Sequence, residues 1–170
     1  MGLNMNGNYE SVLRDCEIEL NSIKCWIEGH RLDSNVRFLT LYAVIKASGT
    51  VEYVFKQMIY DYLENGANNE AKLFLSKSTL DASYNPTPGQ MYKVLEKMNP
   101  DWRVTFEDVI KGSTQKGQLN SLVDLRNSFA HGASITASIS DVKDYFDAGK
   151  WILEELYKVC LLYTSDAADE

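Results

Sequence analysis

Apolar residues recur at helical spacing in several stretches of the chain, and strand-like alternation never extends beyond a few residues. The first stretch predicts a helix from Tyr9 to about Glu28, where Gly29 and the residues after it interrupt the pattern. Its apolar positions are Tyr9, Val12, Leu13, Cys16, Leu20, Ile23, Trp26 and Ile27. They fall on one face of a helix, so this face should cover a core.

A second, longer helix is predicted from a cap at Asp33 or Ser34 to Glu64, where Asn65 and Gly66 stop it. Two apolar series run along this stretch. One comprises Phe38, Leu41, Ile45, Phe55, Ile59 and Tyr62, and the other comprises Val44, Ala47, Val51, Val54 and Met58. A helix that is apolar over so much of its circumference belongs in the middle of a bundle.

Ser48 and Glu52 stand in the first of these series, at positions where apolar residues would be expected. One interpretation is a helix break or a close helix crossing at Ser48 and Gly49, with Glu52 directed to solvent. The other interpretation makes Glu52 a buried carboxylate that pairs with a cation. The pattern alone does not separate the two.

The middle of the chain reads as short helices and turns. Helical stretches are predicted at 68–80 and 90–98, and the loop between them contains Pro86 and Pro88. The second stretch should stop before Pro100, because the residue that precedes a proline disfavours the helical conformation. This region is a candidate for substrate or partner selection, although its sequence suggests no mechanism.

Thr105 and Asp108 resemble a variant capping box and predict that a further helix begins there. Residues 112–117 lack the Lys and hydroxyl residue of a phosphate-binding loop, so they should form a linker. A final helix, capped at Ser138 or Ser140, is expected to run from Val142 to Val159. The sequence therefore predicts an all-α antiparallel bundle of four principal helices, with short helices inserted between the second and third.

Length and composition fit one domain, because 170 residues with 45% hydrophobic content can bury a substantial core. No apolar run is long enough to cross a bilayer, and the first residues lack the pattern of a signal peptide. We therefore expect a cytoplasmic protein. Cys16 and Cys25 lie about 13 Å apart along one predicted helix, which is too far for a disulfide. This spacing agrees with a reducing compartment.

The last residues need separate treatment. Residues 160–170 resemble a translated sequencing adapter, so we expect one domain over 1–159, a non-native tail and a missing natural C-terminus. Without the tail's Asp166, Asp169 and Glu170, the formal charge changes from -7 to -4. This acidic balance argues against broad electrostatic binding of nucleic acid, so any such site should be a local groove.

The most unusual stretch is 119–132, because it carries an arginine on the face of a helix that should be apolar. At about 100° per residue, Arg126 lies near the centre of an arc formed by Leu119, Leu122, Val123, Phe129 and Ala130. His131 falls at the last helical position, and Gly132 can adopt the left-handed conformation that ends a helix. Both residues also have ordinary structural interpretations, Arg126 as an ion-pair partner and His131 as a residue favoured by the helix dipole.

The string Arg126-Asn127-Ser128-Phe129-Ala130-His131-Gly132 resembles the signature of the HEPN superfamily. In that signature an Arg and a His are separated by four to six residues, and Asn often follows the Arg. The string precedes the last helix of an all-helical chain, and an earlier long helix carries the segment 48–52. This arrangement resembles the RiboL-PSP-HEPN branch over about residues 9–159, with specific similarity only around these two segments.

The resemblance implies RNA cleavage without a metal or other cofactor, in a cleft between the two protomers of a homodimer. It implies that His131 transfers protons, that Arg126 binds the phosphate and that Asn127 orients the site. It also suggests a setting in bacterial defence or a toxin–antitoxin pair, with a nucleotidyltransferase antitoxin as partner. Two alternatives are a non-catalytic domain that binds RNA or a nucleotide, and a helical protein-interaction module in which Arg126 only pairs with Glu52.

The spacing of the motif offers a physical reason for dimerisation. On a regular helix Arg126 and His131 differ by about 140° in azimuth, so one protomer does not readily direct both side chains at one phosphate. Two such helices that meet at a symmetric interface can surround it. Two histidines and scattered carboxylates do not form a metal site, and His30, in a predicted turn, has no evident role.

A charge in the centre of an apolar face needs a partner, because an unpaired buried charge costs several kcal/mol. Glu52 is the best candidate, since it is the carboxylate within the apolar series of the long helix. We therefore expect the Glu52 carboxylate to lie within about 4 Å of the Arg126 guanidinium. Ser48 and Gly49, one turn away, would support the contact by letting the motif helix approach closely.

Overall fold

The computed structural model describes residues 5–131 and 136–166, and the side chains of these residues up to Cys160. Seven α-helices and one short π-helical segment account for most of this part of the chain, and it contains no strand. The elements are α1 (Gly7–Gly29), α2 (Asn35–Glu64), α3 (Asn69–Leu75), η1 (Ser76–Leu80), α4 (Pro88–Met98), α5 (Pro100–Ile110), α6 (Thr114–Ala130) and α7 (Ile139–Asp166). The predicted all-α class is confirmed, and the short elements lie between the second and third principal helices.

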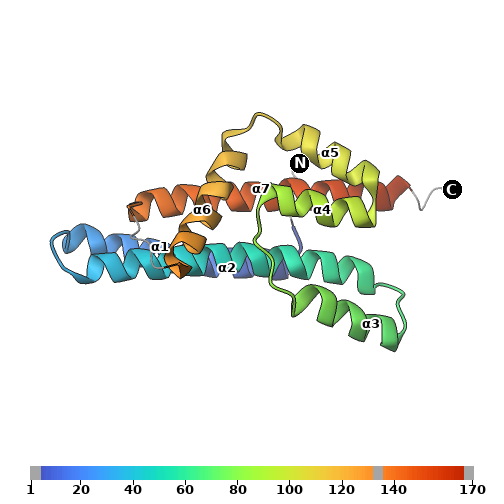
Figure 1. Ribbon diagram of the computed structural model, residues 1–170, viewed down its shortest axis with the longest axis horizontal. Coiled ribbons are helices and arrows are strands. Elements are labelled where there is room, and N and C mark those ends of the chain that lie inside the picture. Colours follow the sequence, from blue (N-terminus) through green and yellow to red (C-terminus); the bar gives the residue numbers. More distant parts are fainter. Residues whose placement is uncertain (1–4, 132–135, 167–170) are drawn as a thin grey trace.

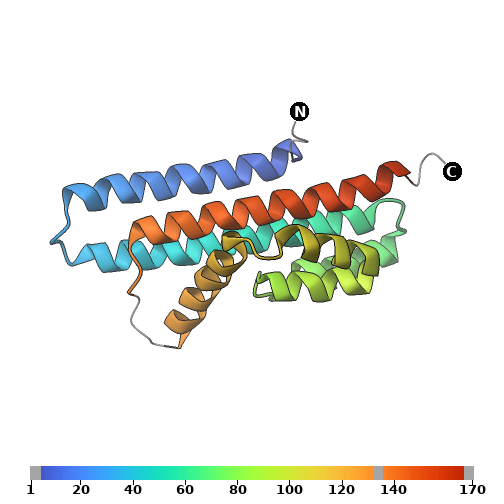
Figure 2. The ribbon, with the colours of Figure 1, turned by 90° about the horizontal axis from the view of Figure 1, so that it is seen from above.

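The three long helices α1, α2 and α7 lie side by side along the length of the molecule (Figures 1 and 2). The helix α2 contacts α1, α6 and α7, so it occupies the central position that its two apolar series predicted. The fourth principal helix, α6, crosses this layer obliquely, and Figure 2 shows its carboxyl end projecting away from α7. The motif at that end is therefore displayed outside the three-helix layer.

The core follows the predicted faces. The second apolar series of α2 is buried throughout, and in the first series Phe55 and Ile59 are buried while Phe38, Ile45 and Tyr62 are exposed. From α1 the core receives Tyr9, Leu13, Cys16, Leu20, Ile23 and Ile27, and from α7 it receives Val142, Phe146, Ile152, Leu153, Leu156 and Val159. The apolar residues of α2 that remain exposed lie mainly toward its amino end.

Several predicted boundaries shift. The helix α5 begins at Pro100, where Asn99 accepts hydrogen bonds from the first backbone N–H groups and proline suits the first helical position. The predicted cap at Thr105 is therefore wrong, because that residue lies inside α5. The expected linker at 112–117 is partly helical, since α6 already begins at Thr114 behind the cap of Ser113.

The last helix begins behind Ser138, one of the two predicted caps. Its hydroxyl accepts from the backbone N–H of Asp141, and the Asp141 carboxylate accepts from the backbone N–H of Ser138. This reciprocal pair is a capping box. The helix continues to Asp166, beyond the predicted end at Val159. No helix among the described residues is long and apolar enough to span a membrane.

The close helix crossing lies at a different glycine from the one expected. A Cβ atom added to Gly149 of α7 would lie 2.8 Å from a methyl carbon of Val51 on α2, whereas one added to Gly49 would meet nothing within 4 Å. The prediction that Ser48 and Gly49 admit a neighbouring helix is therefore wrong for Gly49. The tight contact between α2 and α7 depends on the missing side chain of Gly149.

Gly149→Ala should lower the free energy of unfolding by about 1 kcal/mol, because the clash with stiff Val51 outweighs the better helix propensity of alanine. Gly49→Ala is the matched control and should raise it by somewhat less than about 1 kcal/mol. Urea unfolding of both variants measures the difference. Equal stabilisation by the two substitutions would show that the contact at Gly149 is not tight.

Candidate functional site

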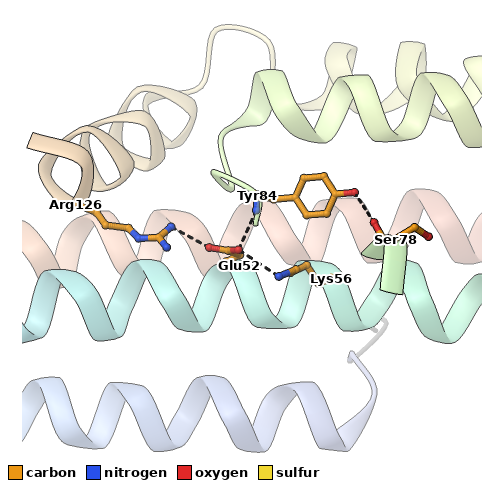
Figure 3. A network of polar contacts seen from close by, with 5 residues as sticks. All are labelled: Glu52, Lys56, Ser78, Tyr84 and Arg126. Carbon is orange, nitrogen blue, oxygen red and sulfur yellow. Dashed lines mark hydrogen bonds and ion pairs between the residues drawn. The ribbon is translucent and has the colours of Figure 1, made fainter. Parts of the chain in front are cut away.

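The centre of the site is the carboxylate of Glu52, a residue in the middle of α2 that is only 7% exposed as a whole. Its Oε2 accepts a hydrogen bond from the Arg126 guanidinium at 2.9 Å. Its Oε1 accepts from the backbone N–H of Tyr84 at 3.0 Å and from the Lys56 ammonium at 3.3 Å. Figure 3 shows the three donors converging on the carboxylate from α2, α6 and the loop before α4.

The expected contact between Glu52 and Arg126 is thus confirmed, and the interpretation that directed Glu52 to solvent is wrong. Glu52 and Arg126 stand 74 residues apart in the sequence, so the pair fixes α6 against α2. Two cations and one backbone N–H surround the carboxylate, which satisfies the hydrogen-bonding capacity that burial would otherwise leave unmet. Glu52, which interrupts the apolar series of α2, therefore holds the motif helix α6 against α2.

Arg126 itself lies at the edge of the protein. Its side chain is 30% exposed, compared with 10% for that of Glu52. A guanidinium carries five N–H donors, and no described residue other than Glu52 accepts from that of Arg126. The ion pair therefore orients the guanidinium and leaves further donors available for an anionic ligand.

His131 is the residue that ends α6. Its backbone N–H donates to the carbonyl oxygens of Asn127 and Ser128, both at 3.2 Å, and the residue is exposed. Among the described residues none forms a hydrogen bond with its imidazole. The predicted left-handed Gly132 lies outside the described residues. The imidazole is thus presented to solvent, five residues beyond Arg126 on the same helix.

Asn127 and Ser48 are the two other residues predicted to support the site. Asn127 is half-buried, and its carbonyl oxygen accepts from the His131 backbone. Ser48 is fully buried, but its hydroxyl has no hydrogen-bond partner among the described residues and does not reach Glu52. The proposed functions of Asn127 and Ser48 therefore stay predictions.

The apolar arc around Arg126 is only half covered. Leu119, Leu122 and Val123 are buried, whereas Phe129 is 37% exposed and Ala130 is also exposed. The reason is geometric, because α6 crosses the bundle obliquely and its last turns pass beyond the core (Figure 2). Phe129 and Ala130 therefore belong to the predicted apolar arc but do not pack into the described core.

Exposed apolar side chains also continue along α2 from Glu52. Ile45 and Phe38 lie seven and fourteen residues before Glu52, which places all three on nearly one face of the helix. Ile45 is 44% exposed and Phe38 is 55% exposed. Phe129 is exposed one turn after Arg126 on α6. We call Phe38, Ile45 and Phe129 together the motif-side surface.

A family model described as RiboL-PSP-HEPN matches residues 11–161. The chain belongs to the RiboL-PSP-HEPN family. No curated protein and no solved structure gives a significant match. Membership in the RiboL-PSP-HEPN family identifies a HEPN-type, RNase-like domain over most of the chain. The motif that carried the resemblance occupies the end of α6, beside the ion pair with Glu52.

Sequence reasoning missed two contacts of Glu52. Lys56 could have been found, because a lysine four residues after a glutamate lies next to it on a helix. The backbone N–H of Tyr84 could not, since it comes from a loop whose position depends on the packing around it. The Tyr84 hydroxyl donates to the carbonyl oxygen of Ser78 at 3.0 Å, which holds this loop against η1 (Figure 3).

Glu52→Gln should lower the free energy of unfolding by about 1–3 kcal/mol, because Arg126 and Lys56 lose their common carboxylate. The expected cost is below that of a fully buried pair, since Arg126 is partly exposed. Urea unfolding measures it, with Glu154→Gln on the exposed side of α7 as the matched control. A loss no larger than that of the control would mean that the ion pair does not stabilise the fold.

Proposed function

We propose that this protein is a metal-independent endoribonuclease of the HEPN type. The observation that carries the proposal is the guanidinium of Arg126, oriented by a buried carboxylate and still open to a ligand, five residues before an exposed imidazole. Membership in the RiboL-PSP-HEPN family supports the same assignment. The substrate is an RNA strand whose scissile phosphate lies beside the end of α6.

The residues suit cleavage that uses the neighbouring 2′-hydroxyl of RNA. The reaction removes a proton from that hydroxyl, gives a proton to the leaving 5′-oxygen and builds negative charge on the phosphorane. An imidazole can exchange protons near neutral pH, which suits His131 to the proton transfers. A permanently charged, forked guanidinium suits Arg126 to the phosphate. Asn127 would orient the site as a neutral donor and acceptor.

We further propose that the complete site forms between two protomers. The angular separation of Arg126 and His131 on a helix, about 140°, supports a site to which two motif helices contribute. The motif-side surface supports it too, because Phe38, Ile45 and Phe129 expose apolar area that a second copy would cover. An interface there would bring the two motifs near a two-fold axis.

One observation favours a second candidate. The Arg126–Glu52 contact is also what a purely structural module requires. In a non-catalytic HEPN domain, the same residues would only bind RNA or a nucleotide. In either case the cleavage experiment below separates these functions from catalysis. A role in bacterial defence, as a toxin held by a nucleotidyltransferase antitoxin in the cytoplasm, is the setting that we propose for the nuclease.

The purified protein should cleave mixed RNA in the presence of EDTA and leave 2′,3′-cyclic phosphate or 3′-phosphate ends. His131→Ala and Arg126→Ala should each lower the rate roughly a hundredfold or more, since each removes proton transfer or charge stabilisation. His30→Ala and Arg14→Ala are the matched controls, because both side chains are exposed and lie on or just after α1. Retained cleavage in a folded His131→Ala or Arg126→Ala protein would contradict the proposed function.

Ile45→Glu should dissociate the dimer and lower activity, because it introduces a charge into the motif-side surface. Ile18→Glu is its control, since Ile18 is equally apolar and exposed but lies on α1. Sedimentation measures the oligomeric state, and the specific activity of the unmodified protein should fall on dilution through the dimer dissociation constant. A monomer of undiminished activity would rule out the shared site.

A further inference from the structure

A large cavity of the described structure lies outside the motif. It has a volume of about 1260 Å³ and opens between the second half of α2, the α3–η1 segment and α4. Figure 1 shows α3 on one side of α2 and the α4–α5 pair on the other, with the loop before α4 crossing between them. We call this cavity the insertion cleft, because residues 65–110 form most of its walls.

The insertion cleft is cationic, although the chain as a whole carries a formal charge of -7. Four of its lining side chains are cationic, Lys56, Lys93, Lys97 and Arg103, and one is anionic, Glu96. Arg103 pairs with Glu96 and Glu107. In contrast, no ion pair with a described residue neutralises Lys93 or Lys97, which lie four residues apart on one face of α4. The cleft thus offers two unpaired ammonium groups to an anionic ligand.

Aromatic rings accompany these cations. Phe74 is 71% exposed at the rim, and Tyr84 and Tyr92 line the wall. The Arg103 guanidinium lies 5.9 Å from the centre of the Tyr92 ring, and the Lys116 ammonium lies 5.3 Å from it. Tyr84 and Tyr92 are half-buried, so Phe74 is the exposed ring of the cleft. Proteins bind single-stranded nucleic acid with aromatic rings beside positive charge, because bases stack on the rings while phosphates contact the cations.

The cleft lies beside the Glu52 carboxylate that holds Arg126. Lys56 and Tyr84 line the cleft, and both also donate hydrogen bonds to the Glu52 carboxylate that holds Arg126. Along α2, the lining residues Phe55 to Leu63 lie about 5 to 17 Å beyond Glu52. A strand whose phosphate contacts Arg126 could therefore extend directly into the cleft.

We infer that the insertion cleft binds the nucleotides that flank the scissile phosphodiester, with Lys93 and Lys97 on their phosphates and Phe74 stacked on a base. This inference rests on the proposed function, because it assumes that RNA is the substrate. It assigns the region between α2 and α6 to substrate binding. The residues of the cleft then set how much of the strand beyond the cleavage point the protein holds.

Binding of fluorescent 2′-O-methyl oligonucleotides of increasing length tests the inference, because they lack the free 2′-hydroxyl and are not cleaved. Anisotropy should show that affinity for the full-length protein rises with length and that Lys93→Gln/Lys97→Gln removes this gain. The slope of log K against log salt should become shallower by about 1.4, at about 0.7 for each phosphate contact to a single strand. Lys24→Gln/Lys111→Gln removes the same charge outside the cleft and should leave the slope unchanged.

A second pair of variants tests stacking. Phe74→Ala should weaken binding of the longer oligonucleotides about fivefold or more, as expected for the loss of a ring that stacks on a base. Leu73→Ala is the control, since Leu73 is 60% exposed, adjacent in sequence and outside the lining. Cleavage of a dinucleotide substrate should be the same in all of these variants, because they leave Arg126 and His131 intact.

The outcomes separate the cleft from the nuclease. If the protein cleaves RNA but the cleft variants bind all lengths as tightly as their controls, the inference is overturned and the proposed function stands. If binding depends on the cleft but no RNA is cleaved, the nuclease assignment fails and the cleft remains a binding site. If free adenosine monophosphate binds with the same dependence on Lys93 and Lys97 and added length gives no gain, the cleft is a nucleotide pocket and the strand inference is overturned.

Discussion

The geometry of the candidate site depends on the contacts of the buried Glu52 carboxylate. The carboxylate forms an ion pair with Arg126 of α6. It also accepts hydrogen bonds from the Lys56 ammonium on its own helix and from the backbone N–H of Tyr84 in the loop before α4. A carboxylate on a residue that is only 7% exposed requires such partners, because an unpaired charge at that depth would cost several kcal/mol. Its burial therefore couples the position of the motif helix to the loop that carries Tyr84.

The packing of the long helices explains why the motif stays accessible. The contact of Gly149 with Val51 brings α7 close against α2, and α6 then crosses these helices obliquely. Its first turns bury Leu119 and Leu122, while its last turns, with Phe129 and His131, extend past the core. A helix fully aligned with the bundle would have covered these residues with the protein's own side chains. The oblique crossing leaves them exposed, as the proposed substrate and second protomer require.

The inserted elements between α2 and α6 form the second surface that we propose for RNA binding, beside the Arg126 site. They place aromatic rings and unpaired lysines around a cleft whose wall shares Lys56 and Tyr84 with the Glu52 cluster. An acidic protein that acts on RNA needs its positive charge concentrated where the strand lies, since its overall field does not attract phosphate. In the proposed nuclease, the Arg126 site and the insertion cleft together would supply this local positive charge.

The sequence by itself determined the helical class, most helix boundaries, the HEPN motif and the pairing of Glu52 with Arg126. These follow from local rules, because apolar spacing reports the buried face of a helix and a charge on that face requires a partner. The start of α5 could also have been predicted from the sequence, because Asn99 is a favourable N-cap and Pro100 suits the first helical position. The weaker capping pattern at Thr105 favoured a later start.

Only the tertiary structure decided which apolar residues remain exposed, which glycine lies at the close crossing and where the cleft opens. Phe38 and Phe129 have the spacing of core residues, yet both are exposed in the packed structure. Lys93, Phe74 and Tyr84 line one cavity although they lie on α4, α3 and the loop before α4. They meet there only because these separate elements pack against one another. Local patterns carry no information about such angles and distances, because these arise from the packing of all the helices at once.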